Sequence, residues 1–444
     1  MRTLDEGYVD RSLPKMTSMV QDNMHWSGEK FCKDQSLKVF NHKHKLYNIT
    51  MSGEFPDHDE PQTILHFNET SGSDKTLNQE GYRRVIENLR NEGVEPLVVR
   101  GTPEFNIETG LVVPHRIIEI RDDEGTRIQT VRDDESEPVE FGATSIRDYR
   151  PRAYLQAVEA AGANVVNTAA VRELDYKDTA YELISDLQPR TLILEPSEFY
   201  AQLHAIRGSR AVLKPVGAAG GRGRLIASKA DLINPDMFHL QQQENGYRLK
   251  GETDPPIDLD LTENYLLQEF IDTKQPFPPG IELIDSCRPF YDAHQHDRKE
   301  VRLMMYWDQS RPDSQKIIPF GRIFTPKAGA VADGTGNTED DSYLLIDIEK
   351  GLPSDLHHMT TDVMNRIAES RGATYIHGAI DCVFDGQRWY VMELNLWQPV
   401  PPSYKEAREH GAESLAEVHR ASLARLMADA ARDAQAANKL KYNQ

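Results

Sequence analysis

The stretch 211–227, AVLKPVGAAGGRGRLIA, carries the residue types of a phosphate-binding loop. Lys214 lies in a short apolar run, and four glycines follow it: Gly217, Gly220, Gly221 and Gly223. Glycine tolerates positive φ and leaves backbone N–H groups free to face an anion, and the lysine supplies a point charge. An apolar run follows the glycines, whereas the Walker loop and the dinucleotide fingerprint both lead into a helix. The pattern therefore predicts a strand–loop–strand lid over a nucleotide.

A second group of candidates lies on a predicted β-hairpin at residues 375–397. Asp381 stands in its first apolar strand, and Glu393 and Asn395 stand two residues apart in the second, so they share one face. A short Gly-Gln turn brings Asp381 close to that pair. Three oxygen ligands completed by water and phosphate suit Mg²⁺ and argue against Zn²⁺ or a redox metal. The alternative is an ordinary hairpin with solvated acids, but the apolar neighbours indicate buried strands, where an acid needs a partner.

Single polar residues add further candidates. Lys177 lies in a predicted helix, where a solvated helix face is the alternative. Arg302 interrupts the apolar strand 300–307, which indicates a polar site or an ion pair. Gln268 and Glu269 follow two leucines in LLQEFID, and the exposed alternation of a strand explains them equally well. A substrate carboxylate has four candidate partners: Arg288, Arg302, Arg322 and Lys327.

Several predicted elements must position these residues. The alternation of strand and helix patterns over residues 61–166, with a strand at 63–67 and a helix at 77–92, predicts a small α/β domain. The polar stretches 241–260 and 273–298 predict surface insertions.

A last helix is predicted over residues 404–435. Leu415, Val418 and Leu426 form its apolar face. This face is expected to pack either within the chain or across a homodimer.

Composition limits the class of protein. The chain has 444 residues, enough for two or three domains, and its 39% hydrophobic and 27% charged content is typical of soluble globular proteins. It has no long apolar run, no signal-like N-terminal segment and three widely spaced cysteines, so we expect a cytoplasmic protein without a membrane partner. The net charge of −20 argues against a nucleic-acid partner, which needs a basic face.

In order and type, these motifs resemble the ATP-grasp superfamily, and more narrowly its glutathione-synthetase-like carboxylate–amine ligases. The resemblance covers about residues 145–405 and rests on five stretches: NTAAVRELDYKDTAYELISDLQPRTLIL, VLKPVGAAGGRGR, LLQEFID, EVRL and AIDCVFDGQRWYVMELN. It implies an α/β (α+β) fold in which two α+β subdomains sandwich the nucleotide, preceded by a small α/β domain. The expected units are an N-terminal extension, the pre-ATP-grasp domain, a nucleotide-lid subdomain, a metal-binding subdomain and a C-terminal helix, at 1–60, 61–166, 167–270, 271–405 and 406–444.

The resemblance also implies a role for each candidate. Lys177 and Lys214 would hold the α- and β-phosphates of ATP, and Arg302 would join Lys214 in catalysis by stabilising an acyl phosphate and the tetrahedral intermediate. Three glycines would close over the β- and γ-phosphates: Gly220, Gly221 and Gly223. Five residues would meet the adenine and the ribose: Gln268, Glu269, Phe270, Ile271 and Asp272. Three residues would hold two Mg²⁺ ions, for which Mn²⁺ is an alternative: Asp381, Glu393 and Asn395.

The implied activity is ATP- and Mg²⁺-dependent formation of an amide or peptide bond, with release of ADP and phosphate. The expected partners are small carboxylate and amine substrates such as amino acids or peptides. A kinase on the same fold and a non-catalytic ATP-binding regulatory protein are alternatives, and the complete set of three metal ligands argues against the second. After Asn395 the chain continues LWQPVPPSY, where the family often has a Ser/Thr-Pro-Gly segment, so the substrate is not implied.

Overall fold

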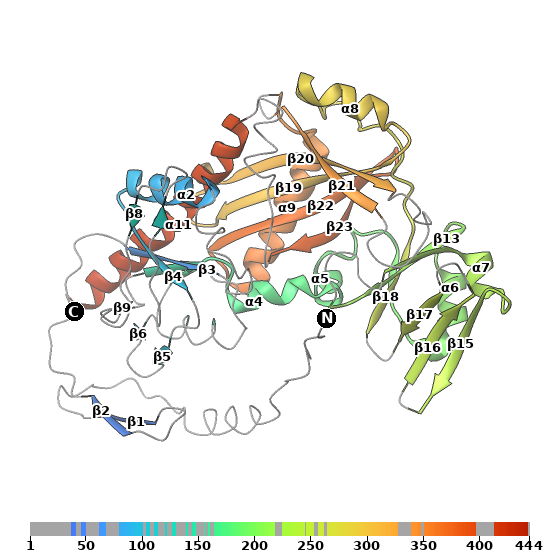
Figure 1. Cartoon of the computed structure of the whole chain (residues 1–444), viewed down its shortest axis with the longest axis horizontal. Coiled ribbons are helices and arrows are strands. Elements are labelled where there is room, and N and C mark those ends of the chain that lie inside the picture. The colour runs from blue at the N-terminus through green and yellow to red at the C-terminus, as the bar shows by residue number, and fades with distance from the viewer. Residues whose placement is uncertain are drawn as a thin grey trace. The chain divides into compact units, whose positions relative to one another are not determined.

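The computed structural model describes part of the chain, and the statements below concern that part. The described ranges are 37–40, 46–49, 62–67, 80–100, 104–106, 111–113, 120–121, 127–129, 139–140, 144–147, 155, 159, 164–217, 224–244, 246–252, 256–261, 264–326, 339–347, 350–396 and 413–442. Two compact units are present, Met1–Asp59 and Glu60–Gln444. In the first, β1 (Leu37–Phe40) and β2 (Leu46–Ile49) form an antiparallel hairpin. The second unit contains every element discussed below (Figure 1).

The second unit begins with a small parallel sheet. Its order is β11-β10-β3-β4, formed by β3 (Gln62–Phe67), β4 (Glu95–Arg100), β10 (Thr144–Arg147) and β11 (Asn164–Val165). Helix α2 (Glu80–Asn91) stands between β3 and β4 in the chain and buries Val85, Ile86 and Leu89, whose spacing defines one helix face. The predicted strand at 63–67 and helix at 77–92 are confirmed.

Short strands connect β4 to β10. One three-stranded sheet contains β5 (Glu104–Asn106), β6 (Leu111–Val113) and β9 (Val139–Glu140), and β7 (Ile120–Arg121) pairs with β8 (Arg127–Gln129).

A four-stranded antiparallel sheet carries the glycine-rich stretch. Its order is β12-β18-β13-β14, formed by β12 (Thr191–Ile193), β13 (Arg210–Pro215), β14 (Leu225–Ser228) and β18 (Tyr265–Glu269). Helices α6 (Phe199–Ala205) and α7 (Lys229–Ile233) share a core with it that includes Phe199, Leu203 and Leu213. The predicted strand–loop–strand arrangement around residues 211–227 is confirmed in its two strands.

The polar stretch 241–260, predicted as a surface insertion, has regular secondary structure. It forms most of a three-stranded antiparallel sheet of β15 (Phe238–Gln243), β16 (Gly246–Gly251) and β17 (Ile257–Asp260). Buried Leu249, Ile257 and Leu259 join the core of the four-stranded sheet, while Asp258 and Asp260 are exposed. This alternation marks a sheet with one buried face, a signal that the high polar content of the stretch concealed.

A five-stranded antiparallel sheet forms the centre of the unit. Its order is β21-β20-β19-β22-β23, formed by β19 (Arg298–Asp308), β20 (Lys316–Pro326), β21 (Glu339–Leu345), β22 (Tyr375–Phe384) and β23 (Trp389–Asn395). The predicted hairpin at 375–397 is therefore confirmed. Helix α9 (Ser354–Arg371) lies behind this sheet in Figure 1, packs into the same core and ends at Gly372, which adopts φ 59°.

Two helical segments complete the surroundings of the site. Helix α4 (Ala169–Arg172), a 3₁₀ turn at Glu173–Asp175 and helix α5 (Lys177–Ile184) bury Val171, Leu174 and Ile184 in the core of the five-stranded sheet. A short helix, α8 (Arg288–Ala293), occupies part of the predicted insertion 273–298.

Helix α11 (Glu413–Tyr442) lies beside α2 (Figure 1). It buries Leu415 and Leu426, while Val418 of the predicted apolar face is 36% exposed. Leu415 and Leu426 therefore pack within the chain, in the core of the five-stranded sheet. None of the helices within the described ranges is long and apolar enough to cross a membrane. Mixed helices and mostly antiparallel sheets confirm the predicted α+β class.

Candidate functional site

Strand β13 positions Lys214. Ala211 and Leu213 face the core of the four-stranded sheet, so the alternation of the strand turns Val212 and Lys214 to its other face. The register pairs Lys214 with Leu266 and Val212 with Gln268 on β18. Lys214, Leu266 and Gln268 consequently line one pocket.

Burial of the Lys214 ammonium lowers its pKa to about 8. Glu393 opposes this shift, while the positive charges of Lys177, Arg224 and Arg298 add to it. Among the described residues, no carboxylate lies within ion-pair distance of Lys214. A phosphate entering this pocket would therefore find a lysine whose charge is not yet compensated.

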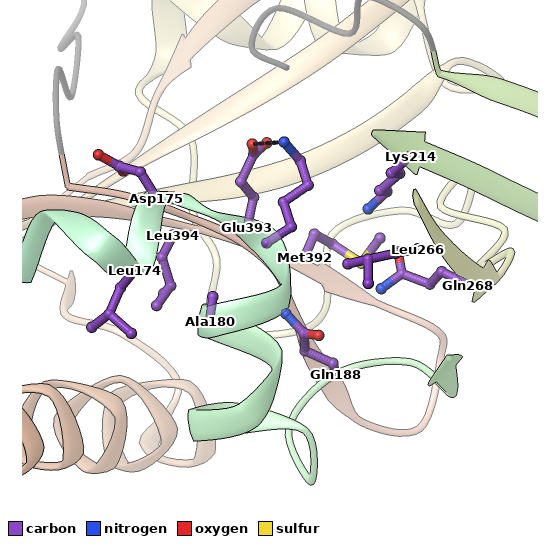
Figure 2. A pocket seen from close by; sticks show the side chains of 11 residues that line it. Leu174, Asp175, Ala180, Gln188, Lys214, Leu266, Gln268, Met392, Glu393 and Leu394 are labelled. Carbon is purple, nitrogen blue, oxygen red and sulfur yellow. Dashed lines mark ion pairs between the residues drawn. The ribbon is translucent and has the colours of Figure 1, made fainter. Parts of the chain in front are cut away.

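Lys177 is the first residue of α5, and its backbone N–H donates to the carbonyl of Val216 at 3.4 Å. This bond joins the start of the helix to the end of β13, immediately before the glycine-rich loop. The Lys177 ammonium lies 3.3 Å from Glu393 Oε1, as the dashed line in Figure 2 marks. Helix α5 thus places the Lys177 ammonium in the pocket, beside Glu393 of the five-stranded sheet.

The pocket joins the two sheets. Figure 2 shows Lys214 and Gln268 on one side of it and Glu393 and Asp175 on the other. Gln188 was not a candidate from the sequence, because a glutamine before an apolar run carries no recognisable signal. The carbonyl oxygens of Gln188 and Gln268 are buried and accept no hydrogen bond from the described residues. Two unsatisfied amide oxygens in a pocket are suited to accept from an amino group of a ligand.

The predicted adenine segment runs from Gln268 to Asp272. The Gln268 Nε2 donates to Thr191 Oγ1 at 2.8 Å, and the Glu269 backbone N–H donates to the carbonyl of Arg190. The Arg210 guanidinium stacks over the Phe270 ring at 4.1 Å. Three residues of this segment, Glu269, Phe270 and Ile271, are partly exposed.

Asp272 is exposed at the end of this segment and accepts from the Lys274 N–H at 3.2 Å. Its side chain is therefore engaged locally in the loop that follows β18.

Arg302 of β19 and Asp381 of β22 are opposed in register and form an ion pair. The guanidinium donates to Asp381 twice, from Nε at 2.6 Å and from Nη2 at 2.7 Å. Burial raises the pKa of Asp381, but the Arg302 charge offsets this and leaves the pKa below its usual value. The prediction that Arg302 points to a polar site or an ion pair is confirmed.

The Asn395 Nδ2 donates to Asp381 Oδ2 at 3.0 Å. The Asn395 Oδ1 takes no part in this hydrogen bond. Glu393 is the register partner of Asp381 on β23. The three predicted metal ligands therefore meet on one face of the hairpin.

An Arg322–Glu300 pair lies in the next row of the same face, on β20 and β19. Arg322 also lies 3.6 Å from Asp381 Oδ2. Burial raises the pKa of Glu300 to about 7, although Arg322 opposes the shift. Glu300 was not a candidate from the sequence, although its neighbour Arg302 was. The pair adds a carboxylate and a guanidinium, both largely buried, beside Arg302.

The donor set of the hairpin fits a hard cation. Two carboxylates and an amide oxygen are the ligand types that Mg²⁺ prefers, usually together with water and substrate phosphates. Within the described part of the chain, no group of three His, Cys, Asp or Glu side chains is close enough to hold a metal alone. A cation here would be held by Asp381, Glu393 and Asn395, and it would supply positive charge to neutralise a bound phosphate.

Some predicted site residues are not brought to this face or cannot be placed. Gly220, Gly221, Gly223 and Lys327 lie outside the described residues. Arg288 is on α8, where its Nε pairs with Asp285 at 3.3 Å, and it does not line the pocket.

No protein-family model and no curated protein matches this chain. Solved structures that match it include the D-cycloserine synthetase DcsG, with 13% identity, a TM-score of 0.43, and coverage of 82% of this chain and 99% of that chain. A RimK domain ATP-grasp protein from Sphaerobacter thermophilus matches with 14% identity, a TM-score of 0.43, and coverage of 83% and 99%. D-alanyl-alanine synthetase A from Vibrio cholerae matches with 9% identity, a TM-score of 0.45, and coverage of 83% and 98%. None of these similarities assigns a residue or a substrate to this chain.

Proposed function

We propose that this chain is an ATP- and Mg²⁺-dependent ligase of the ATP-grasp type that joins a carboxylate to an amine. The observation that carries the proposal is one pocket between two sheets, with Lys177 and Lys214 facing Glu393 and with Asp381 beside it. Cations on one side and oxygen ligands on the other are what a bound nucleotide triphosphate and its metal require. A glutathione-synthetase-like specificity for amino acids or small peptides is part of the proposal.

The two lysines and the adenine segment would bind the nucleotide. Lys214 and Lys177 would contact phosphate oxygens, and Gln188 and Gln268 would offer amide oxygens to the amino group of adenine. The glycine-rich loop that joins β13 to β14 would cover the phosphates with backbone N–H groups. By excluding water, this cover would protect an activated acyl phosphate from hydrolysis.

Asp381, Glu393 and Asn395 would hold Mg²⁺, with two ions proposed and Mn²⁺ as a substitute. When bound, the metal would neutralise charge on the phosphates. Arg302 would stabilise the acyl phosphate and the tetrahedral intermediate, and its two hydrogen bonds to Asp381 on the same face support this proposal. The Arg322–Glu300 pair adjoins it in the next row of the same face, and Arg322 would be a further partner for a substrate carboxylate.

The test is phosphate release from ATP with pools of amino acids and peptides. Release that requires both an acid and an amine supports the ligase. Phosphate transfer to a hydroxyl compound without free phosphate would replace it with a kinase, and nucleotide binding without turnover of any pool would replace it with a regulatory protein. Lys214→Ala and Glu393→Ala should abolish turnover.

A control variant is Lys250→Ala, which removes a lysine from β16, outside the pocket. It should leave turnover unchanged. Near-normal turnover of Lys214→Ala would contradict the assignment of the pocket.

A further inference from the structure

The end of β23 is held by two side chains that the proposed chemistry does not use. Leu396 follows Asn395 and is 1% exposed. Its backbone N–H donates to Asp175 Oδ1 at 2.6 Å, and its carbonyl accepts from Asn167 Nδ2 at 2.5 Å. Both polar groups of this one peptide residue are thus bound by side chains from the segment that precedes α5.

The side-chain amide of Asn167 pairs with the backbone of His377 in the way that a neighbouring strand residue would. Its Oδ1 accepts from the His377 N–H at 2.8 Å and its Nδ2 donates to the His377 carbonyl at 2.5 Å. A hydrogen-bonded pair in an antiparallel ladder exchanges the same two bonds. Asn167 also adopts φ 62° and is 3% exposed, a conformation that costs energy for a residue other than glycine and persists only when the surroundings enforce it.

The peptide plane links Leu396 to the proposed metal ligand. The Leu396 N–H and the Asn395 carbonyl belong to one planar peptide, so fixing the first fixes the second. The backbone of Asn395 is thereby held at its carbonyl end, and its side chain is held separately, because Nδ2 donates to Asp381 Oδ2. The segment that holds Leu396 also delivers Lys177 to Glu393. Residues 167–177 therefore contact Glu393 itself and Leu396, the residue after Asn395.

We propose that Asp175 and Asn167 are positioning residues, which fix the end of β23 so that Glu393 and Asn395 present their oxygens to a divalent cation. This inference rests on the proposed function. Asp175 lines the pocket beside Lys177, yet its Oδ1 is committed to a backbone N–H. Through this Oδ1 it acts on Leu396.

The experiment uses the full-length chain with Mn²⁺ and ADP as probes, and follows Mn²⁺ binding by electron paramagnetic resonance. Asp175→Ala should weaken Mn²⁺ binding by about 10- to 100-fold, the usual cost of losing a group that orients a metal ligand. Asp175→Asn keeps an oxygen that can accept from the Leu396 N–H and should retain most of the affinity. This rescue distinguishes hydrogen bonding to the strand end from the charge of Asp175.

The matched control is Asn164→Ala. Asn164 lies three residues before Asn167 and donates to the Ala430 carbonyl of α11 at 2.9 Å, so its loss also frees one backbone group but not at β23. It should leave Mn²⁺ affinity unchanged. Asn167→Gly removes the amide while permitting the positive φ, and should reproduce the loss seen in Asp175→Ala.

The outcomes separate two failures. Wild-type protein that binds no Mn²⁺ in the presence of ADP contradicts the proposed function, and the inference with it. Wild-type binding that Asp175→Ala leaves intact overturns the inference alone. Equal losses in Asp175→Ala and Asn164→Ala also overturn it, because they show general destabilisation.

Discussion

The four-stranded sheet brings Lys214 of β13 to the pocket, whereas the five-stranded sheet holds Asp381 of β22 next to the pocket residue Glu393. Lys214 has no carboxylate within ion-pair distance among the described residues, and burial lowers its pKa to about 8. Asp381 receives two hydrogen bonds from Arg302 and one from Asn395, and its pKa lies below its usual value. One sheet therefore holds an uncompensated charge, and the other holds a compensated one.

The two charges are suited to different tasks: Lys214 to binding an anion, and Asp381 to holding its neighbours in place. An uncompensated buried cation costs stability until an anion arrives, which favours ligand binding. A compensated buried pair keeps the acids in fixed positions, but removing one partner leaves the other charge buried alone. We therefore expect substitutions in the two sheets to separate activity from stability.

The largest effect on stability is expected for Asp381→Ala. It leaves Arg302 and Arg322 buried without their shared acid, which should cost about 3–5 kcal/mol of unfolding free energy. Urea unfolding measures this loss. The matched control is Asp186→Ala, which breaks the more exposed pair with Arg366 and should cost less than about 1 kcal/mol. Equal losses would contradict the view that Asp381 is part of a compensated buried pair.

Lys214→Met should reverse that pattern. Turnover should fall on the order of 100- to 1000-fold, as when one preorganised donor to a developing charge is lost. The melting temperature should be unchanged or higher, because the substitution removes a buried ammonium without breaking an ion pair. Steady-state kinetics and thermal unfolding test both. A lower melting temperature with intact turnover would show that Lys214 has a structural role only.

Gly378→Ala tests how closely the chain after β23 is packed on β22. An added Cβ would lie 2.5 Å from Leu396 Cδ2 and 3.3 Å from the Asn395 carbonyl oxygen. Relief of this overlap must shift Leu396, and we expect a loss of about 1–3 kcal/mol. Chemical denaturation measures it. Gly378 does not adopt a positive φ, so the loss would report the overlap alone. At Gly351, where φ is 77°, an alanine would also strain the backbone.

The pH dependence of stability should report the uncompensated lysine. The folded pKa of Lys214 is about 8 and its ordinary value is 10.5, so the native state binds fewer protons between these pH values. Stability should therefore rise with pH across this range because of Lys214, by at most about 1.4 kcal/mol per pH unit. Lys214→Met should remove this contribution. An identical pH slope in the wild type and the variant would contradict the lowered pKa.

The smallest effect on stability is expected for Lys177→Met. The Lys177–Glu393 pair is partly exposed, with 15% and 36% of the side chains accessible, so its loss should cost less than about 1 kcal/mol. Affinity for ATP should nevertheless fall, because Lys177 is one of the two lysines beside the pocket. Calorimetric titration with ATP checks this. Unchanged affinity would remove Lys177 from the nucleotide site.

Local patterns were sufficient for much of the fold and for one half of the site. The run around Lys214 and the glycines predicted two paired strands, and β13 and β14 pair there. The two-residue spacing of Glu393 and Asn395 placed both on one face of β23, next to Asp381. The strands at 241–260 were not predicted, because frequent polar residues masked the alternation that buries Leu249, Ile257 and Leu259.

The sequence by itself determined which strands and turns carry the reactive residues, because side-chain direction in a strand and the reach of a short turn are local properties. Only the tertiary structure decided which carboxylate pairs with Arg302 and which side chain binds the Leu396 N–H. Arg302 and Asp381 are 79 residues apart, and Asp175 and the Leu396 N–H are 221 apart. Such pairs form because burial demands that each charge and each peptide group find a partner, and the partner available depends on how distant strands are packed.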